Sequence, residues 1–162
     1  MRRLAPGLLL VLALAACVSD GRGLRPGMEA DAVRAQMGNP ALVVPLPAGG
    51  EAWFYPRGRV GRQTFRAEIG ADGKLNKVEQ VLDEQHFDQV IANKTTRDEL
   101  LRMLGPPVYV MHGSLKNEDI WEYTYLWGAQ QPWLVRFGVS PQGLVTGQIR
   151  ISEMGGPSPG RN

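Results

Sequence analysis

The sequence has little of the chemistry that enzymes use: one cysteine and two histidines among 162 residues. His86 and His112 have no ligand residues around them at metal-binding spacing, so we expect no metal site and no bound cofactor. The paired carboxylates Asp83-Glu84 and Glu118-Asp119 are neighbours in sequence, and such neighbours usually point in different directions. No set of residues forms a catalytic constellation. The sequence therefore predicts a protein that is not an enzyme.

The chain also lacks a phosphate-binding loop and an excess of charge. Arg57-Gly58-Arg59-Val60-Gly61 contains two glycines but has neither the Lys-Ser/Thr ending nor the strand-to-helix context of such a loop. The chain has 18 basic and 16 acidic residues. Two of the basic residues, Arg2 and Arg3, belong to the leader described next, so the rest of the chain is balanced. A balanced chain gives no electrostatic reason to expect binding to nucleic acid.

No apolar run is long enough to cross a bilayer, which takes about 20 residues. The longest run, Leu8 to Leu14, follows the two N-terminal arginines and precedes small residues. Residues 1–16 are therefore predicted to be a signal peptide. Leu14-Ala15-Ala16-Cys17 resembles the bacterial lipobox, which predicts a lipid on Cys17 and a lipidated tether over 17–22. Val18 stands where an aspartate would indicate inner-membrane retention, which favours the outer membrane. The alternative is an ordinary signal peptide followed by a free thiol.

What the sequence does contain is a capped helix that occurs twice. The stretch from Thr96 to Pro107 begins with a capping box, Thr96 with Glu99, and stops at Gly105. A similar stretch lies 67 residues upstream, where Gly38 matches Gly105 and Pro40 matches Pro107. This repetition predicts one structural unit used twice.

The alternation of apolar and polar residues predicts strands after each helix. We expect strands around 52–55, 64–69 and 78–82 in the first unit and 119–127, 133–139 and 144–151 in the second, with a possible short edge strand at 108–111. The predicted fold class is α+β: two tandem units of one helix and three antiparallel strands, with helices on one sheet face in a two-layer sandwich. The units span 23–82 and 83–152, and 153–162 is predicted to be a disordered tail.

An aromatic row follows the strand at 119–127, where alternation places four rings on one face. We interpret this row as core, although tryptophan and tyrosine are also typical of binding hot spots. The opposite face has no predicted helix over it, and the loop after 127 favours exposed tryptophans on either side. The candidate partner-binding residues are Arg66, Glu122, Thr124, Trp127, Trp133 and Arg136.

The helix motif and the lipobox together resemble the SmpA/OmlA (BamE-like) family of outer-membrane lipoproteins. Gly27-Met28 with Val33, Met37, Gly38 and Pro40 carries the motif once, and Thr96, Leu100, Leu104, Gly105 and Pro107 carry it again. The resemblance implies a non-catalytic lipoprotein on the periplasmic side of the outer membrane that binds outer-membrane or periplasmic proteins, including the barrel-assembly machinery. Tandem units also resemble β-lactamase inhibitor proteins, so an inhibitor that blocks an enzyme is the alternative.

Overall fold

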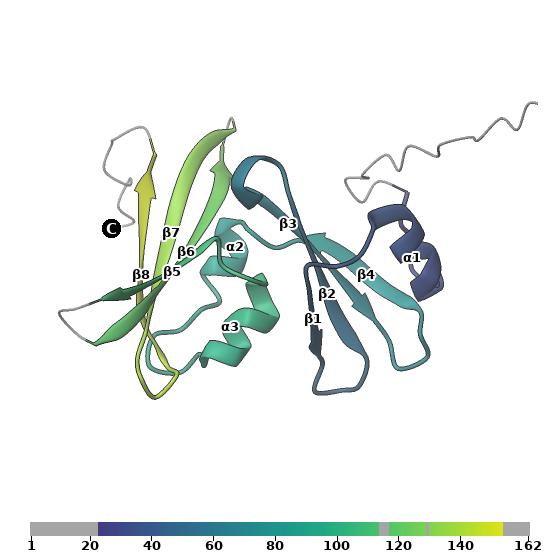
Figure 1. The fold of residues 1–162 in the computed structure, drawn as a ribbon, viewed down its shortest axis with the longest axis horizontal. Coiled ribbons are helices and arrows are strands. Elements are labelled where there is room, and N and C mark those ends of the chain that lie inside the picture. The colour runs from purple at the N-terminus through teal and green to yellow at the C-terminus, as the bar shows by residue number, and fades with distance from the viewer. Residues whose placement is uncertain (1–22, 114–116, 129, 154–162) are drawn as a thin grey trace, which may run out of the picture.

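The computed structural model describes residues 23–113, 117–128 and 130–153, and these form two antiparallel sheets (Figure 1). The first sheet contains β1 (Leu42–Pro45), β2 (Glu51–Arg57), β3 (Gln63–Ile69) and β4 (Leu75–Gln80). The second contains β5 (Tyr109–Gly113), β6 (Glu118–Trp127), β7 (Gln131–Val139) and β8 (Val145–Ser152). In each sheet the strands lie side by side in chain order. The predicted signal peptide, Cys17 and its tether, and residues 154–162 of the predicted tail, lie outside the described residues.

The helices are few and short: α1 (Ala30–Met37), α2 (Glu84–Phe87), α3 (Arg97–Leu104) and the 3-10 turn η1 (Arg59–Gly61). The predicted α+β class is therefore wrong. Strand makes up 47% of the described structure and helix 18%, and each sheet has four strands rather than three. The fold is mostly β, because β1 and β5 extend the two predicted three-stranded sheets at one edge.

The ends of α3 follow the predicted local chemistry. The Thr96 hydroxyl accepts from the Glu99 amide at 3.2 Å, and the Glu99 carboxylate accepts from the Thr96 amide at 2.8 Å. The Thr96 amide and hydroxyl both donate to the Glu99 carboxylate, and these two hydrogen bonds hold the pKa of the Glu99 carboxyl below its ordinary value. A cap of this kind typically stabilises a helix by about 1 kcal/mol. At the other end, Gly105 has φ 78° and ψ −163°, close to the 82° and −169° of Gly38 after α1.

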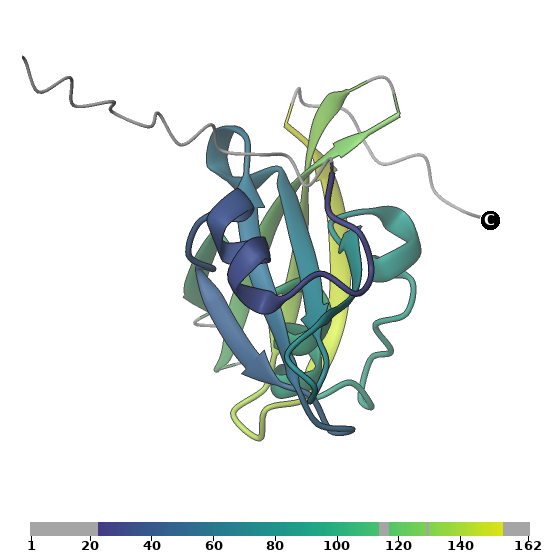
Figure 2. The ribbon, with the colours of Figure 1, turned by 90° about the vertical axis from the view of Figure 1, so that its right-hand side faces the viewer.

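The elements stack in layers, with α1 outermost, then the first sheet, then α2 and α3, then the second sheet (Figure 1). Seen from the α1 side, this helix lies across the strands of the first sheet (Figure 2). Val33 and Met37 of α1 share a core with Trp53 and Tyr55 of β2. On the far face of the same sheet, Phe54 belongs to a cluster against which Leu101 of α3 packs. The first sheet is therefore covered on both faces.

Helix α3 also packs on the second sheet. Leu100 and Leu104 share a core with Trp121, Tyr123 and other inward-facing residues of β6 and β7. The Tyr123 hydroxyl, which is buried, donates to the carbonyl of Gly105 at 3.0 Å. A short helix buried between two sheets thus links them.

A second link between the sheets is η1, which joins β2 to β3 and reaches over to the second sheet. The Thr124 hydroxyl on β6 donates to the Val60 carbonyl at 2.6 Å. Arg62 pairs with Glu153, just after β8, at 2.7 Å. Glu153, the first residue of the predicted tail, is thus held beside the connection between β2 and β3.

Candidate functional site

The outer face of the second sheet, which points away from α3, carries a row of residues in direct register. Met111 on β5 lies beside Ile120 on β6, then Gly138 on β7, then Gly147 on β8. The neighbouring row is Tyr109, Glu122, Arg136 and Ile149. Side chains that alternate along strands point to opposite faces, so both rows belong to the same face.

The two glycines create a trough in this face. It has a volume of about 660 Å³ and is walled by Met111, Ile120 and Ile149, with Arg136 and Thr146 at its sides. A Cβ at Gly138 would collide with the Thr146 hydroxyl, whereas a Cβ at Gly147 would meet no atom within 4 Å. The Thr146 hydroxyl and the Glu118 carboxylate therefore lie over Gly138, whereas the main chain at Gly147 is open enough to receive a side chain from outside. We call this feature the glycine trough.

Strand β5 lies at the edge of the sheet beside the trough. Tyr109, Val110 and Met111 are consecutive and are 57%, 55% and 41% exposed, although all three are large and apolar. An edge strand has a row of N–H and C=O groups that the sheet does not pair, and proteins usually block such edges with charges, proline or a covering segment. The sequence Tyr-Val-Met-His-Gly contains no lysine, acidic residue or proline. The β5 edge is therefore competent to pair with another strand.

Two of the predicted binding residues, Glu122 and Arg136, form an ion pair on this face. Arg136 Nε donates to Glu122 Oε2 at 2.7 Å. The Glu122 side chain is 9% exposed, whereas that of Arg136 is 37% exposed and lines the trough. Of this pair, only Arg136 presents a sizeable charged surface to a partner. Glu122 holds the Arg136 side chain in position.

The structure does not bring the other predicted residues to the same place. Thr124 is buried, with its hydroxyl used by the Val60 carbonyl. Trp133 is buried in the core on the opposite face, and Trp127 packs against it with ring centroids 5.2 Å apart. Trp133 is therefore not exposed as expected, because its ring points into the core, and Thr124 is not on an open face, because loop η1 covers it.

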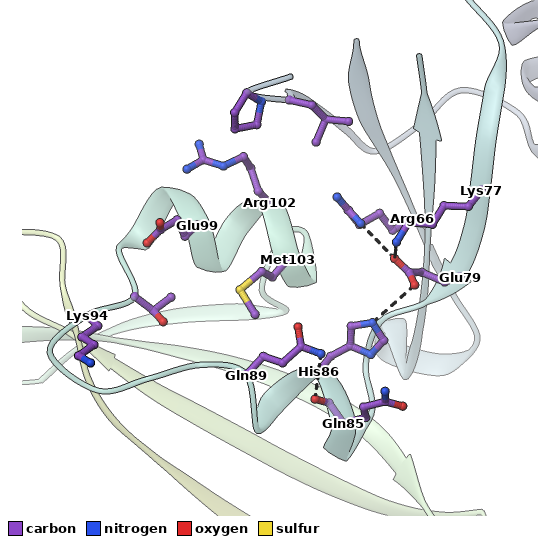
Figure 3. Close-up of a pocket in the computed structure, with 13 residues that line it drawn as sticks. Arg66, Lys77, Glu79, Gln85, His86, Gln89, Lys94, Glu99, Arg102 and Met103 are labelled. Carbon is purple, nitrogen blue, oxygen red and sulfur yellow. Dashed lines mark hydrogen bonds and ion pairs between the residues drawn. The ribbon is translucent and has the colours of Figure 1, made fainter. Parts of the chain in front are cut away.

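Arg66 lies in the first sheet, on the face that α2 and α3 cover. It borders a cleft between that sheet and the two helices, with a volume of about 680 Å³ (Figure 3). Arg66 Nη1 lies 3.0 Å from Glu79 and 2.5 Å from Glu68, and Lys77 Nζ lies 2.9 Å from Glu79. Burial alone would raise the pKa of Glu79, but Lys77 and Arg66 hold it below its ordinary value. The hydrogen bond with Glu79 raises the pKa of Lys77.

The sequence analysis missed the residues that shape the outer face: Tyr109, Met111, Gly138, Gly147 and Ile149. A signal was present, because an isolated glycine inside a strand weakens the strand and often marks a close approach of another molecule. Gly138 and Gly147 lie inside two predicted strands. Their pairing across β7 and β8 could be seen only once the register was known.

The described residues offer little other chemistry. They contain no group of three or more His, Cys, Asp or Glu side chains placed to hold a metal ion. Within the same ranges, no helix has the length and apolar character needed to cross a membrane.

Comparisons with known proteins do not assign the chain to a family. No protein-family model matches it, and no curated protein matches its sequence. Among solved structures, a DUF4309 family protein, YjgB from Bacillus subtilis, is similar with a TM-score of 0.32 and 14% identity, over 76% of this chain and 77% of that one. This similarity is too low to support an argument about fold or function.

Proposed function

We propose that the protein is a non-catalytic lipoprotein that binds other envelope proteins. In this proposal a lipid on Cys17 anchors the chain to the periplasmic side of the outer membrane. The lipobox and the repeated helix motif support a role in outer-membrane protein assembly or envelope integrity, with the barrel-assembly machinery among the partners. Anchoring confines the folded part to the membrane surface and so raises its effective concentration near membrane partners.

The observation that carries protein binding is the β5 edge beside the glycine trough. A partner strand added to β5 would pair with its free main-chain groups, and main-chain hydrogen bonds of this kind supply affinity in strand addition. Gly147 on β8 lies three strands from β5, so the part of the segment that follows the added strand would turn across the outer face to reach the trough. Met111, Ile120 and Ile149 give the trough apolar lining that suits an apolar side chain, and Arg136 suits a carboxylate in the same segment at a distance from Glu118. The proposed occupant is therefore an extended segment of a partner protein.

The inhibitor alternative has less support. It relies on one open sheet face that runs over both units. Helix α3 lies between the two sheets, and the inner face of the first sheet is covered by Leu101 and its neighbours. No observation in the described residues favours this alternative.

We expect two substitutions to abolish partner binding without unfolding the protein. Gly147→Val fills the trough, and it fits the fold because a Cβ there meets no atom within 4 Å. Met111→Lys places a charge on the β5 edge, where the side chain is 41% exposed. The matched control is Val43→Lys, because Val43 is also 41% exposed and lies on β1, the edge strand of the other sheet.

The measurement is capture from detergent-solubilised outer membranes on immobilised full chains, with each variant checked by circular dichroism. We expect wild type and Val43→Lys to capture the same protein in equal amounts. Gly147→Val and Met111→Lys should each capture at least tenfold less of it. Equal capture by all four chains, or capture by none, would contradict the proposal.

A further inference from the structure

The cleft beside Arg66 has an arrangement of charges that the protein-binding proposal does not use. Four basic side chains line it, from Arg66, Lys77, Lys94 and Arg102, against two acidic ones, from Glu79 and Glu99. Glu68 and Glu79 pair with Arg66 and Lys77, so the excess positive charge of the cleft comes from Arg102 and Lys94.

The basic residues are not all neutralised by the protein. Arg102 and Lys94 form no ion pair with any residue that the structure describes. Arg102 is half-buried on α3, while Lys94 is exposed at the rim. Both carboxylate contacts of Arg66 use Nη1, and its Nε is buried without a hydrogen-bond partner in the described structure. Buried polar groups are normally paired, so an unpaired one needs an explanation.

The cleft also has an apolar wall. Met103 lies on α3 beside Arg102, and Leu46 and Pro47 close the cleft from the β1–β2 connection. In Figure 3, Met103 lies between the Arg102 side and the His86–Gln89 side of the cleft. A volume of about 680 Å³ falls within the range of small-molecule sites, roughly 300–1,000 Å³.

We infer that this cleft binds a small organic anion, with a carboxylate or phosphate group held by Arg102 and Arg66 and a short apolar portion against Met103. A guanidinium offers planar paired donors that match carboxylate and phosphate oxygens. His86 on α2 and Gln89 just after it add polar groups to the lining, although His86 Nδ1 is already bonded to Asp83 and Gln89 Nε2 to the Gln85 carbonyl. Lys77 and Arg66 are both paired with carboxylates, so Arg102 and Lys94 provide the charge available to the ligand, and Arg66 adds the donors that its ion pairs leave unused.

The test uses octyl phosphate and octanoate, kept below their micelle concentrations, as anionic probes with an apolar tail. Inorganic phosphate is the charge-only probe and octyl glucoside the uncharged one. Binding to the full chain is followed by chemical-shift changes of backbone amides. We expect saturable binding of at least one tailed anion, with shifts centred on α2, α3 and β3. Inorganic phosphate should bind more weakly, and the glucoside should not bind.

Arg102→Gln should weaken binding by at least tenfold, because it removes the guanidinium that holds the anion. The fold should tolerate the change, since Arg102 acts on Glu99 through its charge without forming an ion pair among the described residues. Arg102→Lys should restore it only in part, since an ammonium lacks the planar fork. The control is Arg97→Gln, which removes an exposed arginine from the same helix outside the cleft. Absence of saturable binding by both tailed anions, or unchanged binding by Arg102→Gln, would overturn the inference. Gly147→Val should bind the probes normally, which separates this site from the protein-binding face.

Discussion

Gly105→Ala should destabilise the fold by about 2–6 kcal/mol, the sum of a backbone cost and a packing cost. Gly105 has φ 78° and ψ −163°, a region that almost only glycine occupies, and strain there costs about 1–3 kcal/mol. A Cβ at this position would also lie 2.5 Å from the Phe54 ring on the first sheet. Because Phe54 is fully buried, its ring has little room to move. Overpacking of this kind typically costs about 1–3 kcal/mol more.

The chain provides a matched control in Gly38→Ala. Gly38 has nearly the same backbone geometry, but a Cβ there would meet nothing within 4 Å. We therefore expect only the backbone cost, about 1–3 kcal/mol. Urea unfolding of both variants measures the difference. Adding Phe54→Leu to Gly105→Ala should recover part of the loss, since the two residues contact each other. Equal costs for the two alanine variants would mean that α3 does not pack against the first sheet as described.

Cys17→Ser should release the protein from the membrane completely, the largest functional effect that the proposal predicts. Each acyl chain contributes about 0.8 kcal/mol per buried CH₂, and stable anchoring needs two signals. Fractionation of cells followed by immunoblotting measures the result. The proposal expects wild type in the outer membrane and Cys17→Ser in the soluble fraction.

Val18→Asp is the companion variant for this experiment. It keeps the lipidated cysteine and changes only the residue that influences sorting in the lipoproteins this leader resembles. We expect the variant to stay membrane-bound but to move to the inner membrane. Membrane association of Cys17→Ser equal to that of wild type would rule out lipid anchoring at this cysteine.

The local features of the fold could be predicted because a few neighbouring residues determine them. The capping box of Thr96 and Glu99 and the stop at Gly105 depend on contacts within one helix. The strand β1 was missed because its four residues, Leu42 to Pro45, end in a proline and do not alternate clearly. Proline is tolerated at a sheet edge, where β1 lies. Pro56 lies inside β2, although the predicted strand stops at residue 55. It is tolerated there because β1 pairs with β2 only as far as Phe54, so the N–H that proline lacks would have no partner on β1.

The arrangement of the two sheets could not be predicted from local alternation. The three leucines of α3 point to more than one side of the helix. Leu100 and Leu104 face the second sheet, while Leu101 also contacts the cluster around Phe54. A short helix buried on two sides must lie between layers. The positions of the leucines in the sequence could have been used to place α3 between two sheets. Arg66 would then have been assigned to a different sheet from the other candidate residues.

The candidate site was predicted only in part, because residues that alternate on one strand can meet different neighbours. Glu122 and Arg136 were placed on the correct face and form a pair there. Thr124 is two residues from Glu122 on the same face, yet loop η1 from a distant part of the chain covers it. No pattern within the strand indicates such a cover. Tertiary contact, rather than strand periodicity, decides which part of the face is open.

Site-specific photo-crosslinking in intact cells tests the central claim, binding of a partner at the β5 edge, most directly. The photoreactive residue replaces either Met111 or Val43. Both native side chains are 41% exposed, and both lie on edge strands. Our account predicts one defined protein adduct from position 111, lost when Gly147→Val is added, and none from position 43. Adducts from both positions alike, or from position 43 alone, would contradict it.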